Sequence, residues 1–160
     1  MDKQTNSACP SIRMGEMSVA SDGDQLRTLL GSCIGLALFD RRRKVGGLAH
    51  IVLPSARGKT DRPGKFVDTA IPKLIEEMET LAGGELNLTA KMAGGACMFA
   101  TAVTANIGRQ NQESCQRLLG ELRIPLVATH CGGGKGRRMS LNTANGRVLI
   151  EIVGQAPIEL

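Results

Sequence analysis

Two apolar runs that flank a charged turn constrain the fold of this chain more than any other feature. Residues 34–39 (Ile-Gly-Leu-Ala-Leu-Phe) and 45–53 (Val-Gly-Gly-Leu-Ala-His-Ile-Val-Leu) are apolar, residues 40–44 are Asp-Arg-Arg-Arg-Lys, and Pro54 follows. An apolar run, a polar turn and a second apolar run predict a β-hairpin. The second run contains a histidine, and a cysteine directly precedes the first run.

The expected pairing of this hairpin brings the cysteine and the histidine together. We expect Phe39 to pair with Val45 or with the residue before it. That register places His50 opposite Ile34 or Cys33. Because directly opposed residues on neighbouring strands have Cβ atoms about 4.5–5.5 Å apart, the imidazole and the thiol would meet. The hairpin therefore indicates an enzyme with a thiol nucleophile.

The rest of the chain alternates strands with two helices. Apolar residues recur at helical spacing over 66–81 and 107–122, which predicts two helices. The expected strands are 11–17, 25–30, 86–92, 124–129, 138–142 and 147–153, the last two joined by the hairpin turn Asn145-Gly146. Residues 55–65 are dense in turn residues and are expected to form an ordered loop or a lid. Hairpins outnumber strand–helix alternations, so we predict an α+β fold with a mostly antiparallel sheet.

Composition narrows the class of protein. The chain has 160 residues, 42% of them hydrophobic and 22% charged, which is typical of one domain with a buried core; we assign residues 11–160 to it and 1–10 to a flexible tail. The N-terminus lacks a signal-peptide apolar region, and no apolar stretch approaches the roughly 18 residues of a membrane span. Five cysteines without disulfide-scaffold density favour a reducing compartment. We therefore expect a cytoplasmic protein without direct membrane insertion, monomeric when alone.

The net charge of +5 invites a nucleic-acid interpretation, which other features oppose. Basic residues cluster at 41–44 and 135–138, but Trp and Tyr are absent and Phe occurs three times, so stacking platforms for single strands are nearly missing. We expect no nucleic-acid partner. The cluster at 41–44 is interpreted either as a solvated hairpin tip or as a surface that steers toward an acidic protein.

Nucleotide, metal and other cofactor sites are not predicted. The glycine-containing segments 58–60 and 132–135 both lack the spacing of a phosphate-binding P-loop. No paired Cys-x-x-Cys occurs, and the adjacent histidine and cysteine near residue 130 would point to opposite faces of a strand. Cys97 and Cys115 are interpreted as small buried apolar residues.

The surroundings of Cys33 suit a nucleophile, although a cysteine in an apolar run is usually part of the core. Gly31 and Gly35 permit a sharp turn that exposes the side chain between them. The same turn would direct the backbone N–H groups of Ser32 and Cys33 toward a developing oxyanion. We further expect nearby His50 to lower the pKa of the thiol.

From about residue 12 to 153 the chain resembles CheD, the chemoreceptor glutamine deamidase of bacterial and archaeal chemotaxis. The matching blocks are Leu-Gly-Ser-Cys-Ile-Gly (30–35), Gly-Gly-Leu-Ala-His-Ile-Val-Leu-Pro (46–54), Gly-Lys-Thr-Asp-Arg-Pro-Gly-Lys-Phe-Val-Asp-Thr-Ala (58–70), Ala-Lys-Met-Ala-Gly-Gly-Ala-Cys-Met-Phe (90–99), Asn-Ile-Gly-Arg-Gln-Asn (106–111) and Gly-Gly-Gly-Lys-Gly-Arg (132–137). Several ordered blocks over most of a chain are far more specific than one motif.

The resemblance implies a layered α/β/β fold similar to the catalytic domain of cytotoxic necrotizing factor toxins, with a Cys-His-Thr triad. Carried over by position, Cys33 is the nucleophile, His50 the base and Thr28 the orienting residue. Thr28 precedes Cys33 by five residues where the familiar family form has six, so an ordinary strand residue is the alternative.

The implied activity is conversion of receptor glutamines to glutamate through a Cys33 thioester, with glutamyl methylesterase activity as a companion. The implied partners are cytoplasmic receptor helices and a CheC-type phosphatase, and the alternative function is a non-catalytic module that regulates CheC. The candidate partner-binding residues are Lys59 and Asp61 in the 55–65 loop, with Met98 and Phe99; Phe99 is equally interpretable as core.

Overall fold

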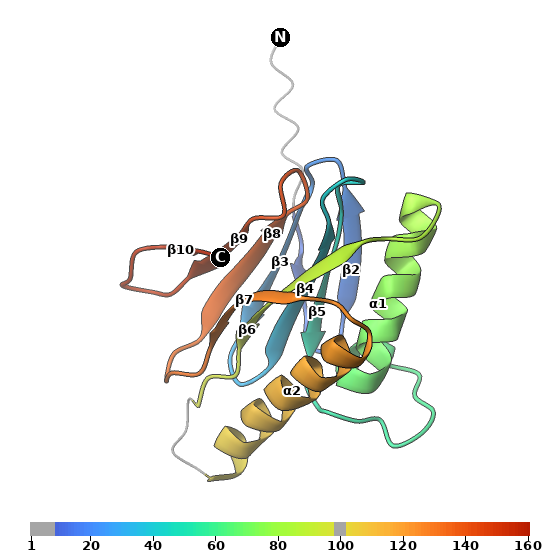
Figure 1. Ribbon diagram of the computed structural model, residues 1–160. Helices are drawn as coiled ribbons and strands as arrows, with labels where there is room; N and C mark the ends of the chain where they lie inside the picture. The colour runs from blue at the N-terminus through green and yellow to red at the C-terminus, as the bar shows by residue number, and fades with distance from the viewer. Residues whose placement is uncertain (1–8, 98–101) are drawn as a thin grey trace.

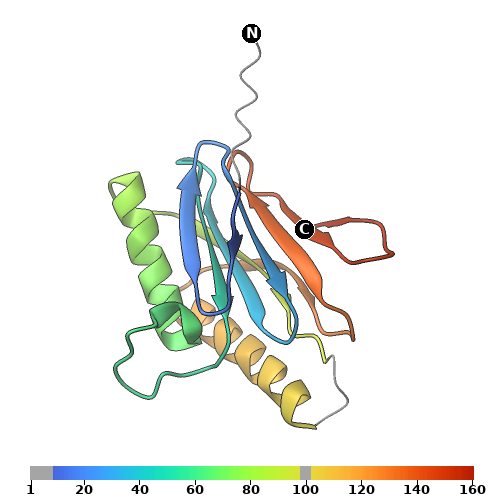
Figure 2. The same cartoon turned by 180° about the vertical axis from the view of Figure 1, so that it is seen from behind.

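The protein is built in three layers, with two helices on one five-stranded sheet and a second five-stranded sheet behind it (Figure 1). The computed structural model describes residues 9–97 and 102–160. Seen from behind, the second sheet lies in front and both helices lie beyond the first sheet (Figure 2). The predicted α+β class and the α/β/β order of layers are therefore confirmed.

Most neighbouring strands are antiparallel, as predicted. The first sheet has the order β2-β5-β4-β6-β7 and the second β1-β3-β8-β9-β10, with parallel pairing at β1–β3 and β6–β7. The strands are β1 Ser11–Ile12, β2 Met17–Ser21, β3 Gln25–Leu30, β4 Ile34–Asp40, β5 Val45–Ile51, β6 Leu88–Gly94, β7 Leu126–Cys131, β8 Arg137–Asn142, β9 Val148–Glu151 and β10 Ile158–Glu159. The helices are α1 Val67–Ala82, α2 Ala102–Glu121 and the short 3-10 helix η1 Pro63–Lys65.

The β4–β5 hairpin forms the centre of the first sheet, and every residue of both strands is buried. Leu36 and Leu38 of β4 belong to the core that also holds the apolar side chains of α1 and α2. Ala37 and Leu48 belong to a second core, between the two sheets. A hairpin covered on both faces has no polar side, which explains its uninterrupted apolar sequence.

The predicted hairpin is confirmed, but its predicted register is wrong. The first strand extends to Asp40, which pairs with Val45. The carboxylate of Asp40 accepts hydrogen bonds from two backbone N–H groups of the turn, each at 2.9 Å, and this leaves a four-residue turn. His50 therefore lies opposite Gly35 and not opposite either predicted residue.

Sequence patterns missed short elements and misplaced some ends. The single strand expected at 11–17 is two strands, β1 and β2, because the chain turns at Gly15, where φ is +77°. The two-residue strand β10 was not predicted, and α2 begins at Ala102 rather than at residue 107. The predicted tail falls largely on residues 1–8, outside the described residues. Among the described residues, no helix is long and apolar enough to span a membrane.

Helix α1 packs tightly against β5 at Gly47. A Cβ on Gly47 would lie 2.7 Å from Leu74 Cδ1 and 2.9 Å from Met78 Sδ, both of which are fully buried. The absence of a side chain at this position therefore sets the distance between the helix layer and the first sheet.

We predict that Gly47→Ala lowers the free energy of unfolding by about 1–3 kcal/mol, because the added methyl group overpacks the contact with α1. Gly120→Ala in α2 is the matched control, since no atom would lie within 4 Å of its Cβ. That control should raise stability by up to about 1 kcal/mol through helix propensity. Urea unfolding measures both, and a Gly47→Ala midpoint equal to that of the wild type would contradict the packing argument.

Candidate active site

The structure brings Thr28 and His50 together from different sheets. His50 lies on β5 and is 3% exposed, and Thr28 lies on β3 and is fully buried. Leu26, Thr28 and Leu30 occupy the buried face of β3, which is directed at the first sheet. The Oγ1 atom of Thr28 lies 2.8 Å from Nδ1 of His50.

A second hydrogen bond fixes which nitrogen of His50 carries the proton. Thr28 Oγ1 donates its single proton to the carbonyl oxygen of Ile12 in β1, at 2.6 Å. The hydroxyl oxygen must then accept from Nδ1–H of His50. The other nitrogen, Nε2, is left with a free lone pair, and it is buried without a hydrogen-bond partner among the described residues. A neutral imidazole in this tautomer is ready to accept a proton at Nε2.

Burial keeps the imidazole neutral. It lowers the pKa of His50, and the opposing effects of the Ile12 carbonyl and the Glu16 carboxylate are smaller. Glu16 also positions the strand, because its backbone carbonyl accepts from the His50 N–H at 2.9 Å. The site therefore holds a base that is unprotonated at neutral pH.

Cys33 lies in the bend between β3 and β4; the residue is 8% exposed and its thiol is not in a disulfide. The bend is held by its carbonyl groups: Gly95 N–H donates to the Cys33 oxygen at 2.9 Å, and Ala96 N–H donates to the Gly31 oxygen at 3.0 Å. No hydrogen bond in the described part of the chain uses the backbone N–H groups of Ser32 and Cys33. The turn thus leaves two amide donors free beside the thiol.

The contact that holds this bend requires glycine at position 94. Gly94 has a φ of +110°, and a Cβ there would overlap the carbonyl oxygen of Cys33. Residue 94 also pairs with Ile34 across the β4–β6 ladder. The end of β6 therefore packs directly against the backbone that carries the thiol. Sequence reasoning did not single out this glycine, although it lies in one of the matching blocks.

Cys33 lies at the end of the hairpin that carries His50. Gly35 is the direct partner of His50, and Cys33 precedes Gly35 by two residues, just before β4 begins at Ile34. Neither the thiol nor His50 Nε2 has a hydrogen-bond partner within the described ranges. Burial raises the pKa of the Cys33 thiol, so the expectation that His50 lowers it is wrong.

A pocket of about 730 Å³ opens onto His50. Arg62 and Glu16 contribute to its wall, and neither was singled out from the sequence. Arg62 reaches the pocket from the loop that follows β5, and its guanidinium donates to the carbonyl oxygen of Met14 at 3.2 Å. The signal for Arg62 was present, since it lies in the matching block at 58–70, but no spacing rule linked it to His50.

The candidate partner-binding residues are not part of the hydrogen-bonded group formed by Thr28, His50 and the Ile12 carbonyl. Lys59 and Asp61 are exposed in the loop between β5 and η1, whose first half is anchored by hydrogen bonds from Ser55 and Ala56 to Asp68. These bonds fix the start of the loop to the first turn of α1. The other two candidates, at 98 and 99, lie outside the described residues.

The remaining cysteines differ in burial. Cys115 is fully buried in α2, as predicted, and burial raises its pKa to about 12. Cys97 is half-buried, so its interpretation as a core residue holds only in part. Cys131 is also half-buried.

A family model and individual relatives match this chain, and their descriptions agree with each other. Residues 52–152 match the family model for CheD chemotactic sensory transduction. A Clostridium novyi (strain NT) protein is 44% identical over 151 residues, covering 89% of this chain and 93% of its own length. Proteins of Clostridium botulinum (strain Eklund 17B) and Methanococcus maripaludis (strain C6) are 41% and 38% identical, covering 93% and 87% of this chain and 96% and 92% of their own. All three are named probable chemoreceptor glutamine deamidase CheD.

We predict that Thr28→Val lowers the free energy of unfolding by about 1–3 kcal/mol, because it leaves a buried donor and a buried acceptor without their shared partner. Thr28→Ser keeps the hydroxyl and should retain most of the stability. Urea unfolding of the two variants measures the difference. Equal destabilisation by Val and Ser would mean that the hydrogen bonds of Thr28 contribute nothing.

We also predict that the free energy of unfolding decreases as the pH falls below about 6.5, the ordinary pKa of histidine. The unfolded chain then binds a proton at residue 50, and the folded chain does not until its lowered pKa is reached. His50→Gln should reduce this slope, measured by urea unfolding between pH 5 and 8. An unchanged slope in the variant would contradict the lowered pKa.

Proposed function

This chain belongs to the CheD family, and from that premise we propose that it converts glutamine side chains of chemotaxis receptors to glutamate. The names of the relatives support the substrate. One observation supports the chemistry above all others: a buried imidazole is held at Nδ1 by Thr28, and its Nε2 has no hydrogen-bond partner among the described residues. His50 pairs with Gly35, two residues after Cys33. In this proposal Cys33 is the nucleophile, His50 the general base and Thr28 the residue that orients His50.

The first half of the reaction forms a thioester. His50 Nε2 takes the thiol proton as Cys33 Sγ attacks the carboxamide carbon of the glutamine. The backbone N–H groups of Ser32 and Cys33 stabilise the oxyanion of the tetrahedral intermediate. Protonated His50 then donates its proton to the amide nitrogen, the carbon–nitrogen bond breaks, and ammonia leaves.

The second half regenerates the enzyme. His50 takes a proton from water, the hydroxide attacks the thioester carbon, and the carbon–sulfur bond breaks to release glutamate. The leaving thiolate of Cys33 recovers the proton that His50 holds. Thr28 keeps Nδ1–H fixed throughout, so Nε2 always faces the reacting atoms.

The protonation states favour proton transfer during attack over a preformed ion pair. Burial raises the pKa of Cys33 and lowers that of His50, so both groups are neutral in the free protein. The proton therefore moves only when a substrate carbonyl is present to accept the sulfur. This arrangement protects the buried thiol from other electrophiles and oxidants.

The same machinery suits a glutamyl methyl ester. Methoxide replaces ammonia as the leaving group, and His50 again supplies its proton. We therefore propose methylesterase activity as a companion to deamidation.

Lys59 and Asp61 support a partner surface for a CheC-type phosphatase. Both side chains are exposed, and neither has a hydrogen bond or ion pair within the described residues. They lie in the loop that also brings Arg62 to the His50 pocket. A phosphatase bound there would lie next to the substrate. A chain that acts only as a regulator of CheC would bind it without deamidating receptors.

We predict that Cys33→Ala abolishes deamidation of a receptor cytoplasmic fragment, because it removes the nucleophile, and that His50→Gln slows it by about 10²–10⁴-fold. Peptide mass spectrometry detects each conversion of glutamine to glutamate. Cys131→Ala is the control, since that half-buried cysteine has no role in the mechanism and should leave the rate unchanged. Full activity of Cys33→Ala would disprove the assignment, and an inactive wild type that binds CheC would favour the regulatory alternative.

A further inference from the structure

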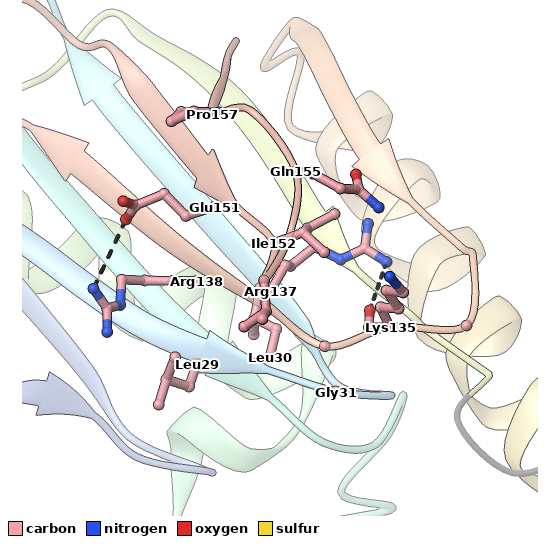
Figure 3. Close-up of a pocket in the computed structure, with 13 residues that line it drawn as sticks. Leu29, Leu30, Gly31, Lys135, Arg137, Arg138, Glu151, Ile152, Gln155 and Pro157 are labelled. Atoms are coloured by element: carbon pink, nitrogen blue, oxygen red, sulfur yellow. Dashed lines mark hydrogen bonds and ion pairs between the residues drawn. The ribbon is translucent and has the colours of Figure 1, made fainter.

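We infer that a second pocket, next to Cys33, binds the part of the substrate that flanks the target glutamine and selects an apolar side chain surrounded by carboxylates. The inference rests on the proposed function and deepens it. This flanking pocket has a volume of about 880 Å³ and lies where the ends of β3, β8 and β9 meet residues 152–157 (Figure 3). It is separate from the pocket that opens onto His50.

The flanking pocket adjoins the reacting groups. Gly31, two residues before Cys33, lines it. Leu29 lines both this pocket and the His50 pocket, so the two pockets share one wall. Leu29 is 59% exposed and projects from the outer face of β3. A polypeptide that lies across Leu29 therefore contacts both pockets.

Several apolar side chains line the flanking pocket. They are Leu29, Leu30, Ile152, Val153 and Pro157. Val153 is 93% exposed, which leaves a branched apolar side chain almost entirely in water beside a concave surface. Apolar side chains grouped around a depression mark binding surfaces more often than isolated ones do. This apolar lining suits an apolar side chain of the substrate.

The rim of the flanking pocket is positively charged. Lys135, Arg137 and Arg138 line it with a single carboxylate, that of Glu151. Arg138 lies 3.9 Å from Glu151 and both are about half-exposed, so this ion pair is weak. Figure 3 shows that pair on one side of the pocket and Lys135 with Arg137 on the other. Neither Lys135 nor Arg137 pairs with a carboxylate of the described residues.

Arg137 is a fixed charge rather than a mobile one. It is 5% exposed, and its guanidinium donates to the carbonyl oxygens of His130 and Gly132. Its Nε is buried without a partner in the described part of the chain. Carbonyl oxygens orient the guanidinium but do not neutralise it. The pocket therefore keeps a preorganised cation that favours a carboxylate at its mouth.

The basic hairpin tip is too far away to provide this selection. Eight residues of extended chain separate Arg41 from Cys33, which corresponds to about 25 Å. Exposed charges are screened over roughly 8–10 Å at physiological ionic strength. Arg43 also donates to the carbonyl oxygen of Ala82 at the end of α1. The cations that can select the residues around the target glutamine are therefore those of the flanking pocket.

The test compares two helical peptides, each with one glutamine and one nearby leucine, in which the flanking residues are either glutamate or serine. Wild-type protein should deamidate the glutamate peptide with a kcat/KM about threefold to fivefold higher than that of the serine peptide. Added salt should reduce the difference. Lys135→Glu should remove or reverse the preference. Arg117→Glu, the same charge change at an exposed position of α2, should keep it.

Binding provides a readout that does not need turnover. Anisotropy of the fluorescein-labelled peptides with the Cys33→Ala protein should show the same order of affinities. Val153→Ser should weaken binding of the leucine peptide more than binding of a matched alanine peptide. Equal affinities for the glutamate and serine peptides, or an unaltered preference in Lys135→Glu, would overturn the inference. Peptides that bind with this preference but are never deamidated would instead contradict the proposed function.

Discussion

The burial of the β4–β5 hairpin on both faces is the constraint on which the rest of the structure depends. One face contacts α1 and α2, and the other contacts the second sheet. Where a neighbouring layer comes closest the hairpin has glycine, at Gly35 against Met139 and Leu30 and at Gly47 against α1. His50 is on the face directed at the second sheet, so its ring is enclosed between the sheets. Thr28, on the inner face of the second sheet, is the residue that holds its Nδ1.

Enclosure determines the electrostatics of the site as well as its geometry. A buried nitrogen without a hydrogen-bond partner lowers the free energy of unfolding by about 1–3 kcal/mol. His50 Nε2 is such an atom among the described residues. The folded protein tolerates this cost because Thr28 satisfies the other nitrogen and the surrounding core supplies stability. The same desolvation keeps thiol and imidazole neutral. Packing in the two cores thus offsets the free-energy cost of keeping the proposed base buried and unpaired.

Periodic patterns in the sequence predicted the large elements well. They did not predict the short elements, whose sequences carry no periodic pattern. The central hairpin, α1 and the β8–β9 turn follow from apolar spacing and from Asn145-Gly146. Every residue of β2 is half-buried, so its sequence shows no alternation, and β10 has only two exposed residues. The hairpin register was misjudged because hydrogen bonds to Asp40, not hydrophobicity, define the turn.

The candidate site was predictable in part. Gln-Leu-Arg-Thr-Leu-Leu alternates exposed and buried residues, which places Thr28 on the inner face of β3 despite its unusual spacing from Cys33. The roles of Gly94 and Arg62 depend on contacts between segments distant in sequence, which no local pattern reveals. The acceptor that completes the chain of hydrogen bonds is the main-chain oxygen of Ile12. This contact is made by the main chain of β1, so a truncation or expression tag that displaces strand β1 disturbs the imidazole directly, even where every side chain of the site is intact.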